Sequence, residues 1–339
     1  MTAGFQGICS MSGNIFQDVY WVAKGVGDDF STHLASRRYS AVIPAEQLGG
    51  KVVACDPKAM SPRDFLDRYK PRVLIFTKAF DWRFVELTKV AQQSGIKIVS
   101  TVVDWHFERD YNQALFQMSD LLVVQTAEMA GTVKEILGRQ PVIIEEPYEG
   151  KRNSPRFSPG DVVNLLWYGS DNNLDGLEFA LRQIARLQGY RFRLVLVCET
   201  REAALEVLKR TPETHSEIKC EIEKWEPAKQ DQAMEEADIV LIPNIDAKEK
   251  RVKGHNRLVA AIHGGRLALA SPLPQYLELK DFCWCGEDMA EGIEWAMDNS
   301  ETTEKRIKNG QSHIDQRFAP SVVAARWRDE VTALISGDG

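Results

Sequence analysis

The sequence predicts an α/β protein of two parallel-sheet domains that face each other across a cleft. The chain has 339 residues, about twice the usual length of one domain. Short β-branched runs alternate with longer segments of helical period in both halves, which is the pattern of parallel sheets covered by helices. Residues 145–160 gather proline, glycine and charge without periodicity, which is typical of a linker. We therefore expect an N-terminal domain over residues 1–148 and a second domain over residues 149–318.

Each half supplies its own strands and helices. The expected strands of the first half are residues 51–54, 72–76, 97–103, 120–124 and 141–144. The expected strands of the second half are residues 162–168, 192–198, 218–222, 239–242, 267–270 and 282–284. The expected helices are residues 82–94, 127–137, 175–187, 202–209, 229–236, 257–263 and 289–297. A last helix over residues 319–335 carries Val323, Trp327 and Val331 on one face, and we expect this face to pack back on the first domain.

Composition excludes several classes of protein. Lys and Arg number 42 against 49 Asp and Glu, so the net charge of −7 argues against a nucleic-acid-binding protein. No apolar run reaches the ~18 residues of a membrane helix and no signal peptide is recognisable, so we expect a cytoplasmic protein. The mixed charges of residues 63–72 leave open a peripheral contact at the inner face of the cell membrane. The cysteine spacing fits no zinc site and no Asp-x-Asp follows a predicted strand, so we expect no metal.

Four segments of the second half occur in a characteristic order and spacing. They are Asn164–Ser170, Arg193–Val197, Ala237–Pro243 and Leu258–Ser271. Together they resemble the donor domain of the GT-B glycosyltransferases, and Gln316-Arg-Phe318 before a tryptophan-bearing helix resembles the end of the same family. The resemblance is greatest to bacterial members that build surface polysaccharides. It implies two Rossmann-like domains, a nucleotide sugar as donor substrate rather than a resident cofactor, and a glycan or lipid-linked acceptor.

The sequence departs from this family at the donor site. Retaining members usually carry two glutamates in an E-x7-E pattern before the glycine of the last βα unit, and here Ala260 and Val252 align with them. The Arg and Lys that usually follow the first glycine of the donor domain are also missing after Gly169. We therefore leave open whether the reaction retains or inverts configuration. A non-catalytic relative that binds a nucleotide sugar or glycan, as a regulator or partner subunit, is the alternative.

A cationic run over residues 248–257 supplies the candidate phosphate site. The leaving diphosphate gains negative charge as the glycosidic bond breaks, so cations and helix N-terminal amides stabilise it. Lys253, Asn256 and Arg257 are expected at the first turn of the helix before Gly264, where they would bind phosphate. The alternative is a solvated charged loop in which Asn256 only caps the helix.

Loops at the carboxyl ends of predicted strands supply the other donor-binding candidates. Gly169 and Ser170 would let backbone amides approach the donor, or would form only a tight turn. Ser271 and Tyr276 would contact the ligand, or Tyr276 would only pack.

The base of the nucleotide is expected near the turns after the second and third strands of the donor domain. Glu199 and Trp225 occupy these turns. Trp225 would stack on the base, or would pack over the next helix.

The acceptor side requires a general base and cations. Asp104 and His106 directly follow an apolar strand and are the candidate catalytic residues, the alternative being that Asp104 caps the next helix. Arg37, Arg38 and Lys78 would bind anionic parts of the acceptor or donor, or would be ordinary surface cations. The sequence identifies neither the sugar, the base and the acceptor nor the oligomeric state.

Overall fold

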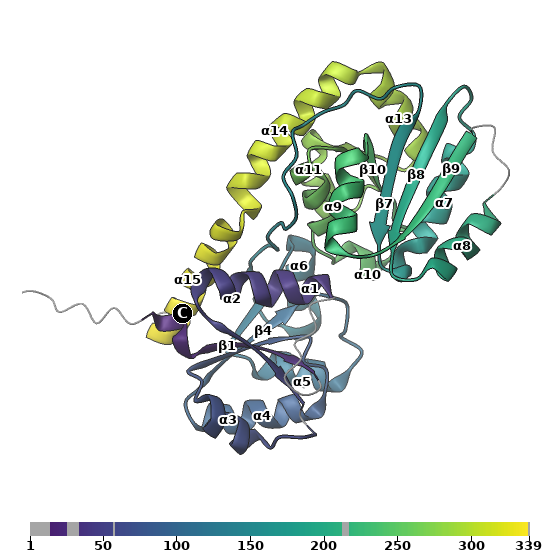
Figure 1. Ribbon diagram of the computed structural model, residues 1–339. Helices are drawn as coiled ribbons and strands as arrows, with labels where there is room; N and C mark the ends of the chain where they lie inside the picture. Colours follow the sequence, from purple (N-terminus) through teal and green to yellow (C-terminus); the bar gives the residue numbers. More distant parts are fainter. Residues whose placement is uncertain (1–13, 26–33, 57, 212–216, 338–339) are drawn as a thin grey trace, which may run out of the picture. The chain divides into compact units, whose positions relative to one another are not determined.

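The computed structural model describes residues 14–25, 34–56, 58–211 and 217–337, and it contains two parallel sheets of six strands each (Figure 1). The first sheet has the strand order β2-β1-β3-β4-β5-β6, and the second has the order β12-β11-β10-β7-β8-β9. The chain divides into two compact units. The first comprises the described parts of residues 1–101, 108–122 and 324–339, and the second comprises those of residues 102–107 and 123–323.

The first sheet is built from the N-terminal part of the chain. Its strands are β1 (Val19–Lys24), β2 (Lys51–Cys55), β3 (Val73–Thr77), β4 (Lys97–Val102), β5 (Leu121–Val124) and β6 (Val142–Ile143). The helices of this part are the 3₁₀-helix η1 (Ile15–Asp18), α1 (Ala35–Arg37), the π-helix η2 (Arg38–Val42), α2 (Ile43–Leu48), α3 (Pro62–Tyr69), α4 (Trp82–Gln93), α5 (Asp110–Met118) and α6 (Ala127–Leu137). The predicted domain boundary at residue 148 falls between the last strand of this sheet and the first strand of the next, and it stays a prediction.

The second sheet follows in the chain. Its strands are β7 (Val163–Gly169), β8 (Arg191–Cys198), β9 (Glu217–Lys224), β10 (Ile239–Ile242), β11 (Leu267–Ala270) and β12 (Trp284–Cys285). The accompanying helices are η3 (Asp171–Asn173), α7 (Leu174–Ile184), α8 (Arg201–Arg210), α9 (Pro227–Glu236), α10 (Lys248–Arg251), α11 (Asn256–His263), α12 (Pro274–Leu277), η4 (Lys280–Phe282), α13 (Met289–Asp298), α14 (Ser300–Phe318) and α15 (Pro320–Ser336).

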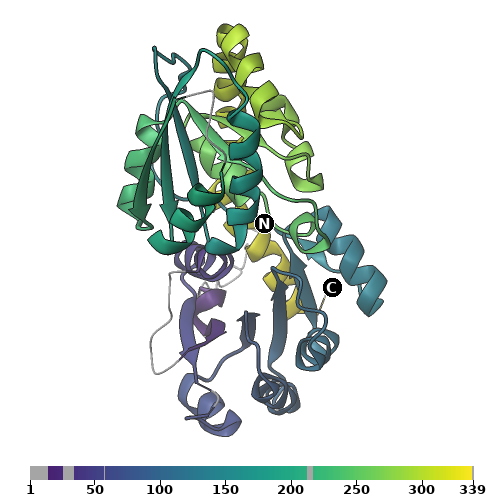
Figure 2. The same cartoon turned by 90° about the vertical axis from the view of Figure 1, so that its right-hand side faces the viewer.

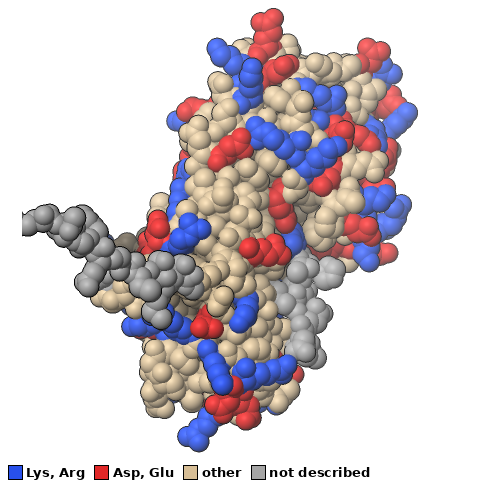
Figure 3. Space-filling model, turned by 60° about the vertical axis from the view of Figure 1, so that its left-hand side comes forward, with Lys and Arg blue, Asp and Glu red and all other residues tan. Residues whose placement is uncertain are grey.

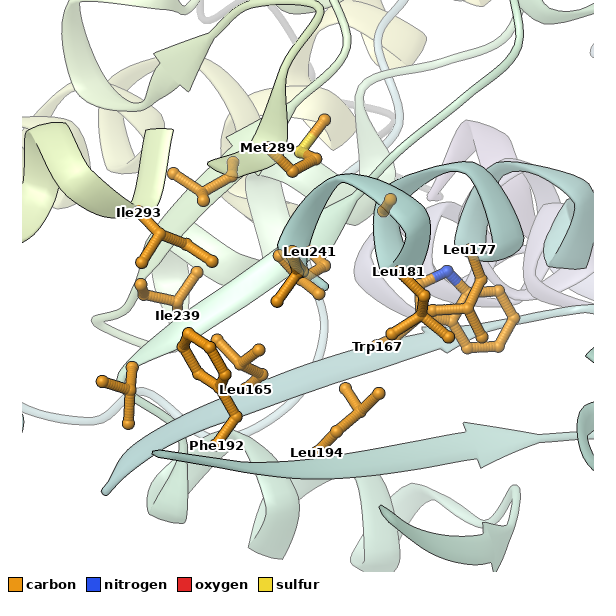
Figure 4. Packing of buried hydrophobic residues seen from close by; sticks show 14 of the residues in the cluster. Leu165, Trp167, Leu177, Leu181, Phe192, Leu194, Ile239, Leu241, Met289 and Ile293 are labelled. Carbon is orange, nitrogen blue, oxygen red and sulfur yellow. The ribbon is translucent and has the colours of Figure 1, made fainter. Parts of the chain in front are cut away.

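The inner strands of the second sheet are buried on both faces because their side chains alternate between two cores. Leu165 and Trp167 of β7 pack in one core with residues of α7, α8 and α13. Leu166 and Tyr168 of the same strand pack in the other core with residues of α9, α11 and α14. Figure 2 shows helices on both sides of these strands. In Figure 4 the ring of Trp167 lies beside Leu177 and close to Leu181 of α7.

The first sheet also buries both faces. Leu74 and Phe76 of β3 pack in one core, where the ring of Phe76 meets that of Phe84 of α4 at 5.6 Å between centroids. Trp21 of β1 is fully buried, and its ring lies 5.9 Å from that of Trp327 in α15. The tryptophan of the last helix thus contacts a strand of the first sheet.

The surface carries mixed charge. Acidic and basic side chains are interspersed over the face shown in Figure 3. No helix among the described residues is long and apolar enough to cross a membrane.

Candidate functional site

The carboxyl edge of the second sheet places a glycine turn next to two polar side chains. β7 ends at Gly169, and Ser170 precedes the short helix η3. The Asn173 side chain, on the last residue of η3, donates from Nδ2 to Ser170 Oγ at 3.1 Å. A Cβ atom on Gly169 would lie 3.5 Å from Asn173 Nδ2 and 3.6 Å from Arg257 Nη1. Gly169 therefore brings the backbone of β7 directly beside a guanidinium group.

Hydrogen bonds with residues at the ends of β7 and β10 hold Arg257 at this edge. Its backbone carbonyl oxygen accepts a hydrogen bond from Tyr168 Oη at 2.8 Å. Its Nη2 donates to the side-chain oxygen Oδ1 of Asn244 at 3.0 Å. The backbone N–H of Asn244 donates in turn to Ser271 Oγ at 2.8 Å. Asn244 follows β10 and Ser271 follows β11, so the end of β10 holds the guanidinium directly, the end of β11 holds Asn244, and the end of β7 holds the backbone of Arg257. Nη1 of Arg257 is buried and has no hydrogen-bond partner among the described residues.

Lys250 of α10 is a second cation at the same place. Its Nζ donates to Asn173 Oδ1 at 2.7 Å and to the carbonyl oxygen of Asn172 at 2.8 Å. Burial lowers the pKa of Lys250, and the nearby charges of Lys253 and Arg257 lower it further. An ammonium whose hydrogen bonds go to neutral oxygen acceptors, and which has like charges nearby, would be stabilised by an anion.

The loop between β10 and α11 differs from the expected arrangement at one residue. Asn256 and Arg257 begin α11 as predicted, but Lys253 precedes that helix by three residues and lies outside its first turn. Asn256 does not cap the helix, because His255 is the N-cap residue. The Asn256 Oδ1 atom instead accepts a hydrogen bond from the Arg257 amide at 2.9 Å.

The predicted catalytic pair lies beside Lys253 within the second compact unit. Asp104 Oδ1 is 3.8 Å from Lys253 Nζ, and Asp104 Oδ2 is 3.9 Å from His106 Nε2. Lys248 forms a cation–π contact with Trp105, which lies between these two residues in the sequence. The Nζ atom of Lys248 is 4.5 Å from the ring centroid. The strand-end loop and the cationic run thus meet at Asp104.

The remaining donor-side candidates differ in exposure. Tyr276 is 3% exposed and packs in the core that contains Tyr168. Ser271 is 5% exposed and its hydroxyl is used by Asn244. Trp225 is half-buried against the same core, with Nε1 donating to Gln230 Oε1 at 2.8 Å, whereas Glu199 is exposed.

The acceptor-side candidates belong to the first compact unit. Arg37 is 9% exposed, and its Nη2 donates to the carbonyl oxygen of Lys24 at the end of β1. Arg38 lies over the ring of Tyr39 at 5.6 Å. Lys78 follows β3 with a backbone φ of +51°. A non-glycine residue in the left-handed region is strained, and such strain is frequent at functional sites.

An ion-pair network holds the start of α11. His255 is 2% exposed, and its Nε2 donates to Glu278 Oε2 at 3.1 Å. Arg317 donates to Glu278 Oε2 at 2.6 Å and to Glu145 Oε1 at 3.0 Å. The hydrogen bonds from His255 and Arg317 lower the pKa of Glu278 to about 2, and burial lowers the pKa of His255.

This network predicts an acid-sensitive fold. The folded-state pKa of His255 lies below its ordinary value of 6.5, so the unfolded chain binds a proton first and stability falls as the pH drops below about 6.5. The contribution of Glu278 is present above its ordinary pKa of 4.5 and is lost as the pH falls towards 2. We expect the melting temperature to decrease from pH 7 to pH 5 and to decrease less in His255→Gln. An equal decrease in both proteins would contradict the assignment.

The residues that align with the usual glutamate pair are both apolar and buried. Ala260 lies within α11 with 8% exposure, and Val252 precedes the helix with 2% exposure. Neither carries a group that hydrogen-bonds a sugar. Within the described ranges, no cluster of three His, Cys, Asp or Glu side chains is arranged to hold a metal ion.

Sequence reasoning missed Lys250, Asn244 and Asn173. Asn244 follows an expected strand, 239–242, by two residues, and the strand-end rule that selected Gly169 and Ser271 applies to it equally. Lys250 lies in the same charged run as Arg257, but nothing in the local pattern indicates that α10 turns this side chain towards η3.

Solved structures resemble this chain over most of its length. Anabaena HepE in complex with UDP-glucose matches with a TM-score of 0.68 at 11% identity, and the match covers 93% of this chain and 99% of that one. The E. coli trehalose-6-phosphate protein bound with UDP-2-fluoro glucose matches with 0.63 at 9% identity, over 92% of this chain and 98% of that one. The chain has the GT-B fold. The predicted α/β class is thereby confirmed.

Another GT-B structure extends the comparison. An α,α-trehalose-phosphate synthase (UDP-forming) from Burkholderia vietnamiensis matches with a TM-score of 0.57 at 10% identity, over 82% of this chain and 76% of that one. No protein-family model matches the sequence, and no curated protein matches it.

Proposed function

We propose that this GT-B protein is a glycosyltransferase that transfers a sugar from a nucleoside-diphosphate donor. The observation that carries the proposal is the buried Nη1 of Arg257, which lies beside Gly169 at the carboxyl edge of the second sheet and has no hydrogen-bond partner in the described part of the chain. Ligands of open α/β sheets bind at this edge. HepE was crystallised with UDP and with UDP-glucose, which makes the uridine nucleotides the first donors to test.

The cations of this edge would stabilise the leaving diphosphate. Arg257 and Lys250 replace the Arg and Lys that usually follow the first glycine of the donor domain, since Lys250 reaches the η3 loop from α10. Lys253 adds a third positive charge nearby. After burial, this charge is the next largest cause of the lowered pKa of Lys250. Negative charge that grows on the diphosphate is favoured by cations already held in place. We propose that the transfer needs no metal, and EDTA should leave the rate unchanged.

Asp104 is the proposed general base for the acceptor hydroxyl. It lies 3.8 Å from Lys253 and 3.9 Å from His106, so a charged partner and a titratable partner both adjoin it. A carboxylate within reach of the hydroxyl proton can accept it as the new bond forms. His106 would orient Asp104 or share the proton. Arg37, Arg38 and Lys78 would hold an anionic acceptor.

Ligand-induced stabilisation tests the proposal. A ligand that binds only the folded protein raises its unfolding free energy by about 2.7 kcal/mol at 100 times its Kd. We expect UDP and UDP-glucose to raise the melting temperature and uridine, which lacks the diphosphate, to do so weakly. GDP- and ADP-glucose serve as controls for the base. If none of these nucleotides shifts the melting temperature, the donor site is wrong.

The buried Ala260 and Val252 favour a second candidate function. Without the two glutamates, the protein would bind a nucleotide sugar without turning it over and would act as a regulator or partner subunit. Release of UDP from UDP-glucose, measured with a panel of glycan and lipid-linked acceptors, separates the two candidates. Binding without release would favour the non-catalytic role. Synthesis of bacterial polysaccharide in the cytoplasm is the context we propose for the catalytic one.

A further inference from the structure

A pocket lies at the edge of the second sheet opposite to the proposed donor site. Its volume is about 740 Å³, which falls in the range of small-molecule sites. Asn164 of β7 lines it, five residues before Gly169, which corresponds to roughly 16 Å along the strand. The pocket is therefore separate from the donor edge. Its lining residues are Lys151, Arg152, Asn153, Ser154, Arg156, Asn164, Arg193, Glu235, Glu236 and Arg266.

Cations outnumber carboxylates in this lining. Three of the cations have carboxylate partners: Lys151 pairs with Glu235 at 2.6 Å, Arg152 with Asp315 at 2.8 Å, and Arg193 with Glu236 at 2.7 Å. Arg156 and Arg266 differ from them, because the described residues give neither a salt-bridge partner. Neither guanidinium forms a salt bridge with a described carboxylate, although the charges of Asp238 and Glu235 act on Arg266 from nearby.

Both of these guanidinium groups are held by backbone carbonyl oxygens. Arg156 donates to Glu235 O at 3.0 Å and to Glu236 O at 3.3 Å. Arg266 donates to Ser154 O at 3.0 Å and to Glu235 O at 2.7 Å. Both arginines thus share the carbonyl oxygen of Glu235, which brings their like charges together. An anion bound between two such guanidinium groups would reduce their repulsion and accept hydrogen bonds from both.

Two buried hydrogen-bond donors of the lining residues have no acceptor among the described residues. Arg266 is 2% exposed, and its Nε is without a hydrogen-bond partner in the described part of the chain. The same holds for Nδ2 of Asn153. Burial of a donor that bonds to nothing is costly, so each of these two groups favours an oxygen partner. Burial, and next the charge of Arg156, lower the pKa of Arg266 to about 10, against the opposing effect of Asp238 and Glu235.

We propose that this pocket binds a small phosphorylated molecule. Its phosphate would lie between the guanidinium groups of Arg156 and Arg266, because guanidinium forks match phosphate oxygens. The amide of Asn153 would donate to the phosphate or to a hydroxyl group. The site is independent of the donor site proposed above and would remain if that proposal failed.

Isothermal titration of the full chain with inorganic phosphate and with ribose 5-phosphate, in a phosphate-free buffer, tests the site. We expect ribose 5-phosphate to bind more tightly than phosphate, because its hydroxyl groups add partners. Arg156→Ala should weaken binding of both at least tenfold. Arg191→Ala is the matched control, since Arg191 is exposed, lies outside the pocket and pairs with Asp161. It should leave both affinities unchanged.

Two further variants keep the result decisive. Ser154→Asp adds a carboxylate to the lining and retains the backbone carbonyl that Arg266 uses, so a folded protein should lose affinity for both anions. Arg257→Ala removes the proposed donor-site cation and should leave unchanged the binding that Arg156→Ala weakens, whereas any binding lost only in Arg257→Ala belongs to the donor site. The proposal is overturned if neither anion binds the unaltered protein. It is also overturned if Arg257→Ala abolishes binding while Arg156→Ala and Ser154→Asp preserve it, because the phosphate then occupies the donor site.

Discussion

Arg257→Ala is expected to weaken the binding of UDP and UDP-glucose about 10- to 150-fold, the loss that corresponds to about 1.5–3 kcal/mol for a hydrogen bond to a charged group. The side chain offers a buried Nη1 that no described residue uses, and its Nη2 is already held by Asn244. The guanidinium is therefore oriented before the ligand arrives, and binding does not have to order it. Titration calorimetry measures the change directly.

Arg251→Ala is the matched control for this variant. Arg251 lies in the same cationic run, but it is exposed and pairs with Asp246 through Nε at 2.7 Å. Loss of a similar exposed charge should change the affinity less than threefold, because exposed ion pairs contribute little. Equal losses in the two variants would mean that only the general positive field matters. Unchanged affinity in Arg257→Ala would remove Arg257 from the donor site.

Trp167→Ala is expected to destabilise the fold by about 3–5 kcal/mol. The side chain is fully buried at the centre of the second sheet, against Leu177 and Leu181 of α7 (Figure 4). Its removal leaves a cavity that neighbouring strands cannot close without breaking their pairing. Urea denaturation followed by far-UV circular dichroism gives the change in unfolding free energy.

Trp167→Phe separates loss of volume from loss of the indole. The indole Nε1 of Trp167 is buried and has no hydrogen-bond partner in the described ranges. Phenylalanine keeps most of the apolar surface and removes this unpaired donor, so we expect a loss well below that of the alanine variant. A loss as large as that of Trp167→Ala would show that the packing depends on the full indole shape.

The inner strands of the second sheet could be predicted closely because they carry two apolar faces. The expected strands 192–198 and 239–242 overlap β8 and β10, whose alternate residues enter the two cores. The strand β1 was missed. Its residues Val19–Ala23 are all buried, and a short apolar run of this kind has neither the helical nor the alternating period.

Helix α14 was missed for the opposite reason. Most of its residues are polar. Its buried positions follow the helical period, but of Thr303, Ile307, Gly310, Gln311, Ile314 and Phe318 only three carry large apolar side chains. Charged residues dominate any short window of the sequence there. The apolar stripe is recognisable only once the helix is known to span 19 residues.

Some features of the candidate site could be predicted from local sequence, whereas others depend on contacts between distant segments. Gly169, Ser271 and Arg257 could be chosen because strand ends and a helix start are visible in the sequence. Their meeting through Asn244 depends on β10 lying between β7 and β11, which is a property of the strand order. The contact of Lys250 with η3 depends on how the four-residue helix α10 is oriented. The sequence periodicity does not indicate that orientation.

Gly176 sets how closely α7 approaches the end of β10. A Cβ atom there would come within 2.6 Å of the carbonyl oxygen of Pro243 and 3.3 Å of Asn244 Cα. Even alanine would therefore force α7 or the Pro243–Asn244 backbone to shift, and the Asn244 side chain holds the guanidinium of Arg257. The proposed donor site consequently depends on the absence of a side chain at Gly176, and we expect directed evolution of nucleotide affinity to leave this glycine unchanged.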